Sequence, residues 1–327
     1  MRIGVDLMGS DSPADVLLNA VIEAGQQLGS SVCLQIIASE CLINQMHEMS
    51  HVCPNLVTEI AHEEILMDDS PLYAIRRKRG ASLVMGIEQL ASKKIDAFLS
   101  LGNTGALMGA ATLSLKMLPS VERPALLACL PTLATPVAVL DIGANVTYKP
   151  HHLVQFAYMG IAYQQCTHNI AKPRIGLLNI GHEPQKGTAD VQETYKALST
   201  EKQNGTMDFI GNIEGREIFN GLVDVVVTDG FTGNILLKTA EGISGFALHK
   251  LQSSLSNLSL SEKDDVKATM QQHLDYSEYS GAILLGVDGI VVKCHGSSSK
   301  KAVINCILRT HDLVKNDLLG KLKNLIK

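Results

Sequence analysis

The sequence predicts an α/β protein whose largely parallel sheet is covered by helices on both faces. Two observations lead to this fold class. Short apolar strands alternate with helical segments along the chain, and each strand is followed by a loop rich in Gly, Asn, Thr or Ser. The 327 residues are 46% hydrophobic and 19% charged, which gives enough apolar surface for a large core and argues against long disordered segments.

The first thirty residues already contain one strand, one loop and one helix. Residues 3–6 are typical of a short buried strand. Ser12 is the expected N-cap of the helix that follows, with Pro13 at its first position. Apolar residues at helical spacing continue to Gly29, where the helix is expected to end.

The same succession recurs along the chain. Predicted strands cover residues 3–6, 96–100, 137–140, 175–180, 223–228 and 291–294, and the later five lead into loops 102–105, 141–145, 181–187, 229–234 and 295–299. No low-complexity linker divides the chain, so we expect a single catalytic unit over residues 1–327, with two intertwined subdomains as the alternative. A Ser/Leu-rich stretch at 252–261 and the charged turn 262–265 are the best candidates for a protruding helical hairpin.

Composition excludes several classes of protein. A net charge of −5 and the absence of Trp disfavour binding to nucleic acid. Seven dispersed cysteines without a C-x-x-C motif indicate reduced thiols in a cytoplasmic protein. The uncharged stretches 97–115 and 124–140 contain a Gly-Asn-Thr-Gly turn and three prolines, respectively, and therefore suit buried strands better than membrane spans. No set of residues has metal-ligand spacing, so neither a metal nor a cofactor is expected.

The loops that follow the strands are the expected ligand site. Ligands of open α/β sheets bind beyond the carboxyl ends of the strands, where glycines and helix N-termini favour anions. One such loop is more often a simple turn, but five at one edge favour a shared site for phosphate or a phosphoester. None matches a nucleotide-binding fingerprint. The candidate substrate-binding residues are Gly102, Asn103, Thr104, Gly105, Asn145, Asp229, Gly230, Gly233, His295 and Ser297.

Three side chains are candidates for catalysis. Lys186 lies in a Gly-bounded loop, where its ammonium group would balance a bound dianion; the alternative is a solvated surface lysine. Asn234 is placed to donate its amide to a developing oxyanion. His62, like His295, is near a plausible site loop, although a single histidine in such a position is more often structural. For Asp229, capping of a helix and a catalytic role are equally supported interpretations.

One dense basic run stands out in this acidic chain. Arg76, Arg77, Lys78 and Arg79 are consecutive. Such a run is usually a solvated helix face. As the only concentrated positive patch, it is also suited to docking an acidic protein partner by charge complementarity.

At this point the sequence resembles the bacterial phosphate acyltransferases (PlsX-type), which make acyl phosphates from thioesters of acyl carrier protein. The resemblance covers nearly the whole chain. Its motifs include residues 5–9, 62–71, 100–107, 123–125, 140–145, 156–160, 177–181, 186–187, 209–215, 229–234, 284–286 and 295–298. The sequence departs from the family at Ser10, Gly80-Ala81, Leu101 and His182, which leaves Asn103, Lys186 and Asn234 in place.

The resemblance implies a three-layer α/β/α sandwich like that of the isocitrate and isopropylmalate dehydrogenases and the phosphotransacetylases. It implies a homodimer that transfers a long fatty acyl group from acyl carrier protein to inorganic phosphate in phospholipid synthesis. The acyl phosphate would then serve a membrane glycerol-3-phosphate acyltransferase. Some family members are cytoplasmic proteins that associate peripherally with the membrane through a protruding amphipathic helical region. The resemblance implies such a region here within residues 244–280.

Chemistry favours direct attack by phosphate, without an acyl-enzyme, because phosphate is already an anionic nucleophile at neutral pH. Two alternatives remain open. One is a phosphotransacylase acting on short-chain acyl-CoA, and the other is a non-catalytic regulator that binds phosphoesters on the same scaffold.

Overall fold

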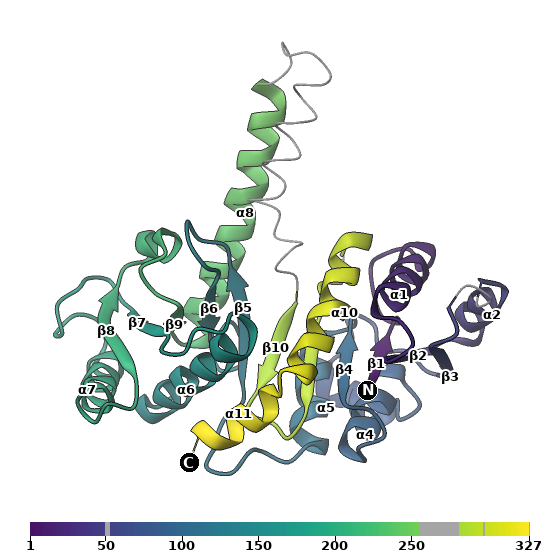
Figure 1. Ribbon diagram of the computed structural model, residues 1–327, viewed down its shortest axis with the longest axis horizontal. Coiled ribbons are helices and arrows are strands. Elements are labelled where there is room, and N and C mark those ends of the chain that lie inside the picture. Colours follow the sequence, from purple (N-terminus) through teal and green to yellow (C-terminus); the bar gives the residue numbers. More distant parts are fainter. Residues whose placement is uncertain (50–52, 255–280, 297, 327) are drawn as a thin grey trace. The chain divides into compact units, whose positions relative to one another are not determined.

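The computed structural model describes residues 1–49, 53–254, 281–296 and 298–326. The chain divides into two compact units (Figure 1). The first unit comprises Met1–Leu126 together with Ser280–Lys327, and the second comprises Leu127–Tyr279.

The first unit contains a mostly parallel sheet. Its strands are β1 (Arg2–Asp6), β2 (Cys33–Ala38), β3 (Leu56–Ile60), β4 (Ala97–Ser100), β10 (Ala282–Leu285) and β11 (Ile290–Lys293). Their order is β3-β2-β1-β4-β11-β10, and only β10 and β11 pair antiparallel. Every residue of β4 and β11 is buried, as expected for strands covered on both faces.

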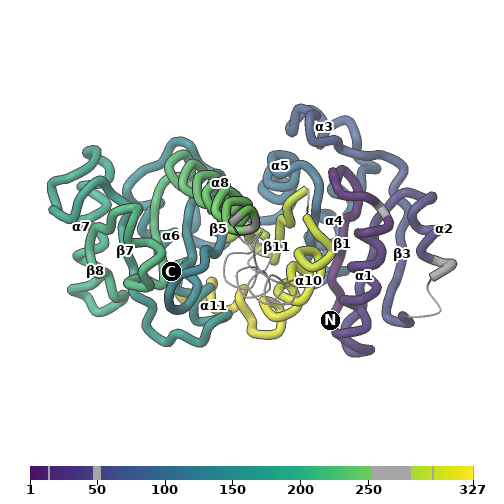
Figure 2. Tube along the Cα trace, turned by 90° about the horizontal axis from the view of Figure 1, so that it is seen from above, coloured from purple at the N-terminus to yellow at the C-terminus, as the bar shows by residue number. Residues whose placement is uncertain are grey.

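Helices cover both faces of this sheet. They are α1 (Ala14–Leu28), α2 (Glu40–Met49), α3 (Pro71–Arg77), α4 (Ser82–Ala91), α5 (Thr104–Ser114), α10 (Lys300–Lys315) and α11 (Leu318–Leu325). Helix α1 packs against α10 on one face, and α4 packs against α5 on the other (Figure 2). Helix α3 packs on α5.

The second unit repeats this layered arrangement. Its strands are β5 (Ala125–Leu130, of which Leu127 onward belongs here), β6 (Val137–Leu140), β7 (Arg174–Leu178), β8 (Asp208–Ile213) and β9 (Val225–Val227). They lie in the order β5-β6-β9-β7-β8, with only β5 and β6 antiparallel. Helices α6 (Pro150–Thr167) and α7 (Ala189–Gln203) pack together, a 3-10 helix η2 (Gly215–Asn220) precedes β9, and α8 (Gly230–Ser254) contacts β6. The predicted α/β/α fold class is confirmed.

Two predicted helix starts are wrong. Ser12 does not cap α1, because its hydroxyl donates instead to the carbonyl oxygens of Gly296 and Ser298, and the helix begins after Pro13. The predicted loop 229–234 is mostly helical, because α8 begins at Gly230. The expected protruding region 244–280 includes the last turns of α8, and its residues 255–280 lie outside the described part of the chain.

Candidate functional site

The predicted site residues fall into one group in each unit. Those of the first unit are His62, Gly102, Asn103, Thr104, Gly105 and His295, and those of the second are Asn145, Lys186, Asp229, Gly230, Gly233 and Asn234. Ser297 lies outside the described residues. In both units the groups follow the carboxyl ends of parallel strands, where the predicted site is expected.

In the first unit a buried row of polar side chains lies at the ends of three adjacent strands. Asp6, Ser100 and Lys293 are the last residues of β1, β4 and β11, and they pair in register. The Ser100 hydroxyl donates to the Asp6 carboxylate over 2.7 Å and accepts the N–H of Gly102 over 3.1 Å. Burial raises the pKa of the Asp6 carboxyl group above its usual range.

Lys293 is a residue that sequence reasoning missed. Its ammonium group donates to the carbonyl oxygens of Leu101, over 3.2 Å, and of Cys294. Burial lowers the pKa of Lys293. One side chain thus joins the loop after β4 to the loop after β11. The only signal in the sequence is a lysine at the end of the otherwise apolar strand 290–293.

Asn103 fixes a second segment to the start of α5. Its side-chain oxygen accepts the N–H of Ala106 and so caps the helix, and its amide nitrogen lies 2.9 Å from the Met67 carbonyl oxygen, with those of Leu66 and Asp69 also within reach. The side chain is buried, and both its oxygen and its nitrogen are hydrogen-bonded within the protein. In contrast, the backbone N–H groups of Thr104 and Gly105 have no acceptor among the residues that the structure describes.

The two candidate histidines of the first unit differ in their surroundings. The His62 side chain is exposed and has no hydrogen-bond partner within the described ranges. His295 is exposed as well, and its carbonyl oxygen accepts from the hydroxyl and the N–H of Ser298. Exposure leaves both imidazoles accessible for proton transfer.

In the second unit the loop after β6 is organised by Asp141, which is fully buried. One carboxylate oxygen accepts the N–H groups of Gly143 and Ala144, and the other accepts the backbone N–H and the side-chain amide of Asn145. The predicted ligand-binding residue Asn145 is therefore buried and bonded to this carboxylate.

Asp229 caps α8. Its carboxylate accepts the N–H groups of Phe231 and Thr232 and the Thr232 hydroxyl. Gly230 donates its N–H to the Asn145 carbonyl oxygen, and a Cβ at Gly233 would lie 1.8 Å from the Asp141 carbonyl oxygen. These two glycines let α8 approach the Asp141 loop closely.

Lys186 and Asn234 are exposed in the second unit. Asn179 fixes the Lys186 loop by donating its side-chain amide to the Lys186 carbonyl oxygen over 3.1 Å, while the ammonium group has no partner within the described residues. The Asn234 side chain lies beside Gly143, with its Oδ1 3.9 Å from an ideal Cβ built there. Both side chains are available to a ligand.

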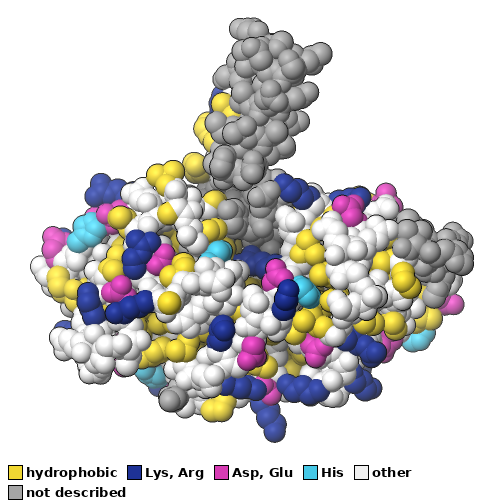
Figure 3. All heavy atoms as spheres, viewed as in Figure 1, with side chains coloured by type: hydrophobic (Ala, Val, Ile, Leu, Met, Phe, Trp, Pro, Cys, Tyr) yellow, Lys and Arg dark blue, Asp and Glu magenta, His cyan; other side chains and the backbone are white. Residues whose placement is uncertain are grey.

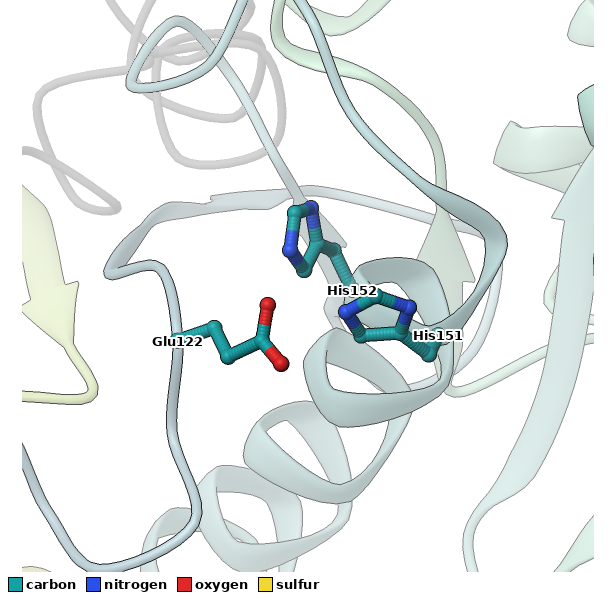
Figure 4. Close-up of side chains that lie close together, drawn as sticks. All are labelled: Glu122, His151 and His152. Carbon is teal, nitrogen blue, oxygen red and sulfur yellow. The ribbon is translucent and has the colours of Figure 1, made fainter.

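A pair of adjacent histidines begins α6 (Figure 4). The ring centroids of His151 and His152 are 4.3 Å apart in an edge-on arrangement. His152 is buried, and its Nδ1 accepts the N–H of Lys149. Figure 4 also draws Glu122, which belongs to the first unit, and we assign no metal site to this group.

Comparison with known proteins gives matches over nearly the whole chain. Residues 1–321 match the model of a family described as fatty acid synthesis protein. The phosphate acyltransferase of Chlamydia pneumoniae is 39% identical, covering 100% of this chain and 99% of that protein. The phosphate acyltransferase of Thermoanaerobacter pseudethanolicus is 37% identical, covering 100% of this chain and 98% of that protein.

Solved structures share the fold at low sequence identity. The EutD phosphotransacetylase of Staphylococcus aureus superposes with a TM-score of 0.62 at 15% identity, covering 96% of this chain and 94% of that one. A Salmonella typhimurium protein assigned as a 4-hydroxythreonine-4-phosphate dehydrogenase gives a TM-score of 0.56 at 12% identity, covering 95% of this chain and 99% of that one. Both likenesses concern the fold alone.

Proposed function

The chain belongs to the phosphate acyltransferase family and is an acyltransferase, and from this premise we propose that it transfers a long fatty acyl group from acyl carrier protein to inorganic phosphate. The products would be an acyl phosphate for phospholipid synthesis and the free thiol form of the carrier. One observation carries the proposal. The ammonium group of Lys186 is exposed, has no partner within the described residues, and sits on a loop that Asn179 holds in place.

The second unit supplies the charged and amide side chains in this proposal. Lys186 neutralises the phosphate dianion, and Asn234 donates its amide to the oxyanion that forms on the thioester carbonyl carbon. The N–H groups of Gly230 and Gly233 are already bonded within the protein, so these glycines act by allowing close approach of α8. Asp229 holds the first turn of α8, which carries Asn234.

The first unit has backbone donors of its own that suit an anion. The N–H groups of Thr104 and Gly105 lie at the start of α5, where the helix dipole favours an anion. In the reaction a phosphate oxygen attacks the carbonyl carbon, the carbon–oxygen bond forms, and the carbon–sulfur bond breaks. The departing thiolate takes up a proton and becomes the free thiol of the carrier.

The experiment combines purified protein, palmitoyl-carrier protein and phosphate, and measures acyl phosphate by trapping it as a hydroxamate. We expect product to form in a phosphate-dependent way, and faster with the carrier thioester than with acyl-CoA. Preference for short-chain acyl-CoA would support the phosphotransacylase alternative. Phosphate binding without consumption of any thioester would support the regulator alternative, and either result would overturn the proposal.

The proposal extends to assembly and location: a homodimer in the cytoplasm that associates peripherally with membrane and supplies a membrane glycerol-3-phosphate acyltransferase. No described helix is both long and apolar enough to cross a bilayer. Apolar side chains are nevertheless exposed along the described part of α8, among them Phe231, Ile235, Ile243 and Phe246. Figure 3 shows apolar atoms, in yellow, at the surface near the base of the protruding segment. Light scattering and sedimentation with vesicles of anionic lipid test these two points.

A further inference from the structure

The exposed face of α3 combines apolar and basic side chains. Leu72 and Tyr73 are 56% and 64% exposed, whereas Ala74 and Ile75 are buried on the other side of the helix. Arg76 and Arg77 follow one helical turn after Leu72 and Tyr73, so all four side chains share one face. The Arg77 guanidinium lies 5.7 Å from the centre of the Tyr73 ring, which is cation–π geometry.

The four consecutive basic residues have different environments. The Lys78 ammonium donates to Asp69 over 2.5 Å, and this hydrogen bond lowers the pKa of Asp69. Arg79 lies 3.6 Å from Glu88. Arg76 has neither an ion pair nor a hydrogen bond within the described chain, and Arg77 has only its ring contact. The unneutralised charge of the basic run is therefore on Arg76 and Arg77.

Helix α3 is held tightly against α5. A Cβ at Gly105 would lie 2.7 Å from Cγ of Pro71, and one at Gly109 would lie 2.8 Å from Cδ1 of Ile75. These close approaches require glycine on the contacting side of α5 (Figure 2 shows the two helices side by side). Since Asn103 also binds the segment leading into α3, the exposed face is fixed relative to the start of α5.

We propose that Leu72, Tyr73, Arg76 and Arg77 form a docking face for an acidic surface of the carrier protein that bears the acyl thioester. This inference rests on the proposed function. The whole chain has a net charge of −5, which repels an acidic partner in general. Charges are screened within about 8 Å at physiological salt, so a local pair of free arginines decides the encounter.

The composition of this face also suits a protein partner. Tyrosine and arginine are enriched among residues that dominate interface energies. Leu72 and Tyr73 offer apolar area to be buried between the two arginines and the partner. Lys78 and Arg79 are excluded from the face because Asp69 and Glu88 already neutralise them.

The test compares the double variant Arg76→Ala/Arg77→Ala with Lys94→Ala/Lys116→Ala, which removes two exposed charges elsewhere in the same unit. Initial rates are measured with acyl-carrier protein and with acyl-pantetheine, at low and high salt. We expect the first variant to raise KM for the carrier thioester about tenfold and to weaken its salt dependence. Its KM for acyl-pantetheine should equal that of the unchanged protein, and the control variant should match the unchanged protein with both substrates.

The outcomes separate the docking face from the function itself. If the unchanged protein makes acyl phosphate but the Arg76/Arg77 variant keeps its KM for the carrier, the docking face is wrong while the function stands. An equal loss in Arg79→Ala would overturn the restriction to four residues. Failure of the unchanged protein with both thioesters would overturn the function. Loss of binding to anionic vesicles with no change in KM would assign the face to a lipid surface instead.

Discussion

Different groups hold the loops that follow β4 and β11 in the first unit and the loop that follows β6 in the second. In the first unit, side-chain donors bind backbone carbonyl groups: Lys293 binds those of Leu101 and Cys294, and Asn103 binds those before α3. In the second unit, the carboxylates of Asp141 and Asp229 bind backbone N–H groups, whereas the Lys186 loop is again held by a side-chain donor, the amide of Asn179. The first arrangement leaves N–H groups open at the start of α5. At Asp141 and Asp229 the nearby backbone N–H groups are bonded, and the exposed polar side chains of the second unit's predicted site are those of Lys186 and Asn234.

We propose that the two units would recognise an anion in different ways. The first would use the helix dipole and backbone donors of α5. The second would use the exposed ammonium group of Lys186 and the side-chain amide of Asn234. Substitutions that remove one type of group in one unit therefore test this difference.

The largest expected effect is that of Lys186→Ala on catalysis. Removal of one charge-stabilising donor from the transition state should lower kcat/KM for phosphate by about 10²–10³-fold. Because the side chain is exposed and unpaired within the described residues, the free energy of unfolding should stay unchanged. Steady-state kinetics and urea unfolding check both points. Lys172→Ala, which removes an exposed charge of the same unit, is the control, and near-normal turnover of Lys186→Ala would remove Lys186 from the mechanism.

Asp141→Asn should cost the most stability. The new amide would turn a donor toward N–H groups that now bond to a carboxylate, and each unsatisfied buried group costs about 1–3 kcal/mol. We expect a loss of about 3 kcal/mol in urea unfolding. Asp6→Asn should cost less, since burial already raises the pKa of Asp6 and favours a neutral group there. Equal losses in the two variants would contradict the contrast between the units, and the exposed Asp190→Asn serves as the control.

Lys293→Met should change the pH dependence of stability. Burial lowers the pKa of Lys293 below 10.5, so between the lowered value and 10.5 the unfolded chain binds more protons than the folded one. Unfolding free energy contributed by this group therefore rises with pH in that window. The variant should lose that rise, measured as the difference between urea curves at pH 7 to 10. The exposed control Lys94→Met should keep the pH slope of the unchanged protein. If Lys293→Met also keeps that slope, the prediction is wrong.

The smallest effect is expected for Asp229→Ala. Loss of the cap of α8 should destabilise the protein by about 1 kcal/mol. Asp229→Ser keeps a capping oxygen and should restore both stability and turnover. If serine restores stability but turnover stays low, Asp229 acts in catalysis as well as in capping.

Much of the fold could be predicted because it depends on local patterns. Strand 137–140 and the strand–loop–helix succession around it follow from apolar runs and turn residues alone. The prediction for Ser12 was wrong because its hydroxyl finds carbonyl partners at 296 and 298, far away in sequence. Local capping rules carry no information about such partners.

The candidate site was predictable by residue type but not by bonding. Asn103 and Asn145 were identified as ligand-binding residues from their loops, yet both side chains are buried and bonded within the protein. Lys293 was missed because its role depends on the register of three strands that are distant in sequence. Among the predicted site residues of the second unit, Lys186 and Asn234 have exposed side chains.

The two-substrate rate pattern distinguishes direct attack by phosphate from an acyl-enzyme route. Direct attack of phosphate on the thioester requires both reactants to be bound at once. Initial rates at varied acyl-carrier protein and phosphate should give intersecting double-reciprocal lines, and rapidly quenched enzyme should carry no acyl group. Parallel lines, together with a stoichiometric acyl–Ser or acyl–Cys adduct in the mass spectrum, would contradict it.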